Sequence, residues 1–175
     1  MRFLLNIIII IGTLIISPLV KSQDINTYNV SANLNIDEKT IEVSQIMEFK
    51  NTSNTKLYEI FLEDWSNSYI NNETELAKRI SDEYSRSFSF AQKRQRGFST
   101  INKLSGENIK SWNRYNSQLD IIRVELSEPI KKNQSISIEI DYIIKLPDYK
   151  FTGYGYDDKN IYLKNWLIVF LNLHK

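Results

Sequence analysis

The chain has 175 residues, 42% of them hydrophobic, and a formal net charge of +1. This is enough apolar sequence for one domain with a real core, and the near-neutral charge gives no electrostatic basis for binding nucleic acid or anionic membranes. The absence of cysteine excludes a disulfide framework and a cysteine-ligated metal site, so the hydrophobic core must hold the fold together.

The first 22 residues have the layout of a secretory signal peptide. Arg2 supplies the positive start, residues 3–16 are almost wholly apolar, and Ser22 is a small residue before an expected cleavage at Gln23. The alternative is an uncleaved anchor, for which the apolar part is short, since a span needs about 20 residues. We expect residues 1–22 to be a signal peptide and 23–175 to form one domain of a secreted or periplasmic protein, with no membrane attachment after cleavage.

Three segments after the leader alternate apolar and polar residues, as half-buried strands do. The first covers residues 28–36 and the second 40–49, with a polar turn at 37–39 between them. In the second segment, Gln45 interrupts an otherwise apolar face. After a polar loop, residues 57–63 form the third segment. This order predicts an antiparallel meander.

A helical period follows over residues 73–96. Asn72 with Glu75 three residues later is typical of a helix start. Three cations within 93–96 and then Gly97 are typical of a last helical turn and its stop. The apolar stripe that recurs every fourth residue comprises Leu76, Ile80, Tyr84 and Phe88.

Strand patterns return after the helix. Residues 98–105 and 109–116 are two short candidates, and residues 118–130 are apolar on both faces where Ile121 and Ile122 adjoin, as in a central strand. The clearest alternation lies in residues 133–146. A final strand is expected within 161–171, after a turn-rich stretch. The whole pattern predicts a mainly β fold, an antiparallel β-sandwich or saddle with one inserted α-helix.

No combination of residues makes a convincing catalytic site. His174 is the single histidine, so it cannot form the two-histidine zinc motif, and a terminal position suits a catalytic base poorly. The carboxylate doublets 63–64 and 157–158 suit turns and caps better than catalysis, because adjacent residues on a strand point to opposite faces. We therefore predict no catalytic, cofactor-binding or metal-binding residue in this chain.

Two other local features have ordinary structural explanations. The basic run 93–97 is explained by a helix end, and the glycines at 153 and 155 lack the following helix that a phosphate-binding loop requires. Aromatic residues lie close together in 149–156, and a stacking platform for sugar rings remains an alternative to a core role there. The aromatic residues in question are Tyr149, Phe151, Tyr154 and Tyr156, with Trp65 and Trp112 elsewhere in the chain.

Several of these segments together resemble the first domain of aminopeptidase-N-like zinc metallopeptidases (gluzincins). That domain opens with a strand like residues 28–36, then a strand ending in an aromatic-x-Asn-Ser/Thr motif, here Phe49 to Thr52, and then an apolar run like 57–62. The later stretch 120–147 is similar to the family's next paired strands, and 151–166 to the approach to its catalytic domain. The resemblance covers most of residues 26–166, and the helix at 73–96 departs from its better-known members.

The resemblance implies a scaffold and no catalytic residue. The family holds zinc with a His-Glu-x-x-His motif and a downstream Glu, and none of these occurs in the 175 residues. It therefore implies a non-catalytic N-terminal domain, incomplete at its C-terminal end, with zinc, peptide substrate and the catalytic domain belonging to a full-length parent. Residues 161–166 are interpreted as a strand start and 167–175 as a broken or out-of-frame end. The alternative is a stand-alone secreted β-sandwich that binds a glycan or a protein partner.

Overall fold

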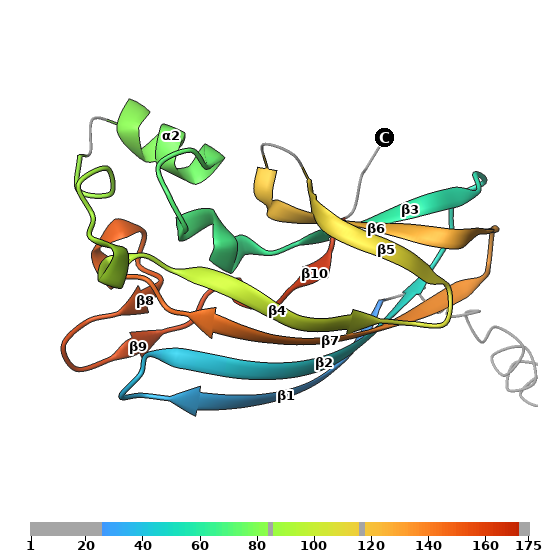
Figure 1. Ribbon diagram of the computed structural model, residues 1–175, viewed down its shortest axis with the longest axis horizontal. Coiled ribbons are helices and arrows are strands. Elements are labelled where there is room, and N and C mark those ends of the chain that lie inside the picture. The colour runs from blue at the N-terminus through green and yellow to red at the C-terminus, as the bar shows by residue number, and fades with distance from the viewer. Residues whose placement is uncertain (1–25, 84–85, 116–117, 172–175) are drawn as a thin grey trace, which may run out of the picture.

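The computed structural model describes residues 26–83, 86–115 and 118–171, and the fold is mainly β (Figure 1). The predicted signal peptide and His174 lie outside the described residues. The strands are β1 (Thr27–Asn35), β2 (Thr40–Lys50), β3 (Leu57–Glu63), β4 (Phe98–Ser105), β5 (Ile109–Tyr115), β6 (Gln118–Ile130), β7 (Ser135–Lys145), β8 (Gly155–Tyr156), β9 (Ile161–Tyr162) and β10 (Val169–Phe170). The helical elements are α2 (Glu75–Asp82) and the short 3-10 helices η1 (Trp65–Tyr69), η2 (Lys93–Gln95) and η3 (Tyr149–Phe151).

Two four-stranded antiparallel sheets face each other as a sandwich. The first sheet has the order β1-β2-β7-β4 and the second β10-β3-β6-β5, and β8 and β9 form a small separate hairpin. In Figure 1 the second sheet lies over one end of the first, while α2, η1 and the β8–β9 hairpin lie at the other end. The predicted β-sandwich class is confirmed, and the predicted meander is split between sheets, because β3 pairs with β6 and not with β2.

The alternating segments of the sequence form the strands of the first sheet. Along β2 and β7 every second side chain points into the sandwich and is buried, as the period of a pleated strand requires. β1 follows the same alternation but is covered only at its beginning. Tyr28 and Val30 are half-buried, whereas Ala32 and Leu34 on the same face are exposed. The inner face of this edge strand is therefore apolar and partly uncovered.

The inserted helix is shorter than the sequence predicts. α2 ends at Asp82, and its N-cap is Thr74, whose hydroxyl accepts a hydrogen bond from the Ala77 amide at 3.2 Å. Leu76 and Ile80 of the apolar stripe are buried on α2, while Tyr84 lies outside the described residues. The serine-rich stretch that follows disfavours helix, because serine side chains compete for backbone hydrogen bonds.

Phe88, the last member of the stripe, is buried away from α2. Its ring packs edge-on against Phe151 at 4.9 Å and Tyr69 at 6.2 Å between centroids. Gly97 is not a helix stop but packs beside Pro147, where a Cβ would approach the proline Cδ to 2.7 Å. The run expected to finish a long helix is a separate short turn, η2, that leads into β4.

The C-terminal segment, as far as residue 171, is packed into the sandwich. The expected final strand is two short pieces, β9 and β10, and β10 pairs antiparallel with β3. Ile168 and Phe170 are buried, which stabilises the fold by roughly 1.5–3 kcal/mol for each side chain. Residues 172–175 lie outside the described part of the chain.

The two turn glycines at 153 and 155 have the backbone conformations expected of turns. Gly155 has φ of 119°, and a Cβ there would lie 1.9 Å from the Pro147 carbonyl oxygen, so only glycine fits. This close approach lets the Tyr156 amide donate to the same oxygen at 2.9 Å. None of the helices in the described ranges has the length and apolar content needed to cross a bilayer.

Candidate functional site

The first carboxylate doublet is divided between two environments, as the alternation of strand side chains predicts. Glu63 ends β3 and is half-buried, whereas the Asp64 side chain is only 1% exposed. One Asp64 oxygen (Oδ2) lies 2.7 Å from Arg114 Nη1 and accepts a hydrogen bond from Ser99 Oγ. The other oxygen (Oδ1) is buried without a partner. The two carboxylates do not converge on one point, so this doublet is not a glycosidase pair.

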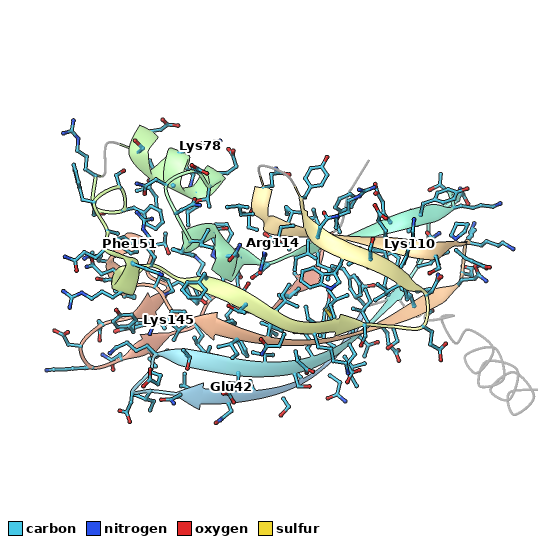
Figure 2. All side chains as sticks on the ribbon, in the orientation of Figure 1. Glu42, Lys78, Lys110, Arg114, Lys145 and Phe151 are labelled. Carbon is cyan, nitrogen blue, oxygen red and sulfur yellow. The ribbon has the colours of Figure 1, made fainter. Side chains whose placement is uncertain are left out.

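Arg114 closes a buried polar cluster between β5, β4 and the end of β3. Figure 2 shows it reaching from β5 toward the segment that follows β3. Its guanidinium also donates to Ser99 Oγ and to the Leu119 carbonyl, both at 2.8 Å. Burial raises the pKa of the Asp64 carboxyl above its ordinary value, and the nearby Arg114 charge opposes that rise. Asp64, Arg114 and Ser99 are bonded to one another, and they hold the end of β3 against β4 and β5.

The polar residues of η1 extend this cluster. Asn67 donates to the Leu119 carbonyl at 2.6 Å, and Ser68 donates to Asp120 at 2.8 Å. On the other side, Ser66 and Tyr154 share a hydrogen bond of 2.9 Å between hydroxyls. Buried polar side chains are stable only when they are hydrogen-bonded, and these are. Sequence reasoning missed this role of the "DWSNSY" stretch, whose four polar residues beside two aromatics were the available signal.

A second buried network explains the glutamine that interrupts β2. Gln45 Nε2 donates to the Ile168 carbonyl at 2.7 Å, and Gln45 Oε1 accepts from the Tyr142 hydroxyl at 2.9 Å. The same hydroxyl accepts from the Ile168 amide at 3.2 Å. Both backbone groups of Ile168 are thus satisfied by side chains of the first sheet. Gln45 is the residue that ties the C-terminal segment to the sandwich.

The aromatic residues divide between core and surface. Tyr154 is fully buried, and Phe151 packs on Phe88, which confirms a core role for this part of the cluster. Tyr149 and Tyr162 form an exposed pair with ring centroids 4.2 Å apart, each 37% exposed. Of the two tryptophans considered with them, Trp65 packs edge-on against Tyr69 and Trp112 is partly exposed on β5. The surface pair is therefore two tyrosines and not a broad platform.

Within the basic run 93–97, Arg96 is held by its neighbours. Arg96 lies over the Phe88 ring at 4.6 Å and donates to the Asn72 side chain at 2.6 Å. Burial lowers the pKa of Arg96 from its ordinary value. Asp157, in the second carboxylate doublet, accepts from the amides of Lys159 and Asn160 and so caps the β8–β9 turn, as predicted for a turn residue.

Exposed apolar side chains gather at one end of the molecule, beside the β8–β9 hairpin. The turn between β1 and β2 reaches this hairpin, because Lys39 Nζ lies 4.7 Å from the centre of the Tyr156 ring. We call this surface the end patch, and its members are Leu34 (41% exposed), Ile36 (68%), Tyr149, Tyr162 and Leu163 (43%).

Two hollows lie on the surface of the sandwich. The first, of about 380 Å³, runs along the C-terminal segment and is lined by Glu63, Trp65, Asn165, Trp166, Leu167 and Val169. The second, of about 330 Å³, lies on the polar outer face of the first sheet and includes Ser31, Glu42 and Asp141. In the described part of the chain, no three histidine or carboxylate side chains are grouped to hold a metal ion.

No protein-family model matches the chain, and no curated protein sequence matches it significantly.

Proposed function

We propose that this chain is a non-catalytic scaffold domain of a secreted zinc aminopeptidase-like metallopeptidase, and that it docks against a catalytic domain. The end patch carries the proposal, because it places uncovered apolar side chains beside the C-terminal part of the fold. The Trp65–Trp166 hollow adds a second apolar surface along the same segment. The strand pattern of the sequence, which resembles that family, supplies the identity of the partner.

The scaffold role agrees with the chemistry of the buried groups. Asp64, the most deeply buried carboxylate, is committed to Arg114 and Ser99. Among the residues that the structure describes there is no histidine to activate Ser99 as a nucleophile. The zinc, the peptide substrate and the general base of such an enzyme would all belong to the catalytic domain.

A binding experiment tests the docking surface. The purified chain is added to an aminopeptidase-N-like catalytic domain that lacks its own first domain, and complex formation is followed by light scattering. We expect a complex that Leu163→Asp weakens at least tenfold, because a carboxylate would be buried in an apolar contact. Tyr58→Asp is the matched control, since Tyr58 is 65% exposed on β3 and outside the end patch. Equal effects of the two variants, or no complex, would refute the surface.

An activity assay tests the non-catalytic part of the proposal. The chain is incubated with aminoacyl p-nitroanilides and zinc, with and without a chelator. We expect no release of p-nitroaniline above the buffer rate. Chelator-sensitive hydrolysis by the 175-residue chain alone would contradict the proposal.

The second candidate is a stand-alone glycan-binding module, which the exposed Tyr149–Tyr162 pair favours. The rings of this pair are tilted by 38° to each other, and an exposed tyrosine ring can present a face to a sugar ring. Beside it, Asp157 accepts a hydrogen bond from the Tyr162 hydroxyl at 3.3 Å. A glycan array distinguishes the two candidates. Binding that Tyr162→Ala abolishes and Trp112→Ala leaves intact would support the module and remove the need for a catalytic partner.

A further inference from the structure

The outer edges of the two large sheets are protected to different extents. Sheet edges expose unpaired backbone groups, and proteins usually blunt them with bulges, charges, prolines or very short strands. β4 has a register shift between Ile101 and Lys103, and β5 has two such shifts along its pairing with β6. β10 is only two residues long. Three of the four edges therefore carry a recognised protection.

β1 is the exception among the described strands. It has nine residues, Thr27–Asn35, and every one of them is paired with β2 in an unbroken register. Its sequence, TYNVSANLN, contains no charged residue, no proline and no glycine. Its other side has no neighbouring strand in the described part of the fold. β1 thus presents an unbroken, uncharged row of backbone donors and acceptors.

The sequence of β1 is symmetric in polarity about Ser31. If two copies of β1 run antiparallel with Ser31 opposite Ser31, then Tyr28 faces Leu34 and Val30 faces Ala32 on the inner face. On the outer face, Asn29 faces Asn33. Apolar side chains meet apolar ones and amides meet amides, and no like charges are brought together.

We propose that β1 pairs antiparallel with β1 of a second copy of this chain, about a two-fold axis at Ser31. The β1-β2-β7-β4 sheets of the two copies then form one continuous sheet across the dimer. The pairing also covers part of Ala32 and Leu34, the exposed inner side chains of β1. The symmetric order of apolar and polar residues in β1 favours a second copy of this chain over an unrelated strand, because β1 of a second copy always carries the same order. This inference does not rest on the proposed function, although the dimer surface and the end patch share Leu34.

The area of contact sets the expected strength. Stable dimers bury roughly 1,200–2,000 Å² in total, and one pair of nine-residue strands buries less than this. We therefore expect a reversible dimer that forms at micromolar or higher concentrations and dissociates on dilution.

Charge substitutions at the two-fold axis test the register directly. Ser31 is exposed, so Ser31→Lys or Ser31→Glu leaves the core untouched while placing like charges opposite each other across the dimer. Sedimentation velocity over a concentration series should show a dimer for the wild-type chain and monomers for each variant alone. An equimolar mixture of the two variants should restore the dimer, because lysine then faces glutamate.

Ser44→Lys is the matched control, because Ser44 lies beside Ser31 on the same exposed face but on the inner strand β2. It should leave the dimer intact. A second design, Asn29→Glu with Asn33→Lys, places opposite charges across the same axis and should tighten the dimer.

Four results would overturn the proposal. They are a wild-type chain that stays monomeric at all concentrations, a dimer that survives Ser31→Lys, an equal loss with Ser44→Lys, and a mixture of Ser31 variants that does not reassociate.

Discussion

Removing the Tyr142 hydroxyl should weaken the attachment of the C-terminal segment to the sandwich. Tyr142→Phe keeps the buried ring but deletes the group that accepts from the Ile168 amide and donates to Gln45 Oε1. Two buried polar groups then lose their partner, and each such loss costs about 1–3 kcal/mol. We expect a total loss of roughly 2–6 kcal/mol in the free energy of unfolding. Burial raises the pKa of Tyr142, so the hydroxyl is neutral and the effect is constant near neutral pH.

Urea titration followed by circular dichroism measures this loss. The m-value should stay unchanged, so the whole effect appears as a lower midpoint. Hydrogen exchange at Leu171, whose amide donates to the Phe61 carbonyl at 2.9 Å, should also speed up, because this bond anchors β10 to β3. Tyr58→Phe is the control on an exposed tyrosine and should change stability by less than about 0.5 kcal/mol. A Tyr142→Phe variant as stable as this control would refute the role assigned to the network.

Arg114→Met leaves Asp64 buried without its cation and should destabilise the fold by about 3 kcal/mol in the same urea titration. Arg123→Met is the control: it breaks a half-exposed pair with Glu59 and should cost less than about 1 kcal/mol. Burial raises the pKa of Asp64 in the folded state, so the free energy of unfolding falls as pH rises from the unfolded-state pKa through the folded-state pKa. The stability lost in Arg114→Met should therefore shrink on acidification. A loss that does not depend on pH would argue against an unpaired Asp64 charge. Hydrogen bonds from the Lys159 and Asn160 amides lower the pKa of Asp157. Asp157 therefore stabilises the β8–β9 turn above its unfolded-state pKa, and this stabilisation is lost as pH falls through its folded-state pKa. An NMR titration of Asp157 should give a midpoint below that of an ordinary aspartate.

The strands were predictable because their signal is local. Along β7 the apolar residues at every second position are buried, and only a strand with one face in the core gives that period. Residues 57–63 were predicted to the same bounds that β3 has in the structure. The assignment of β3 to the second sheet was not predictable, because pairing with β6 joins segments far apart in the chain.

The errors arose where distant contacts override local pattern. A fourfold apolar period continued past Asp82, but Phe88 packs against Phe151 and Tyr69 instead of extending α2. The packing of residues 167–171 also depends on side chains distant in the sequence, because Gln45 and Tyr142 hold Ile168 in the core. The buried ion pair was invisible for the same reason, because its two members come from β5 and from the end of β3.

The proposed scaffold role in a zinc aminopeptidase-like enzyme is tested most directly by the DNA sequence that follows the Lys175 codon in its source genome, translated in all three forward frames. If the chain is such a domain, this DNA encodes His-Glu-x-x-His and a downstream glutamate. An unrelated gene that begins immediately after this codon, with neither motif in any frame, would contradict it.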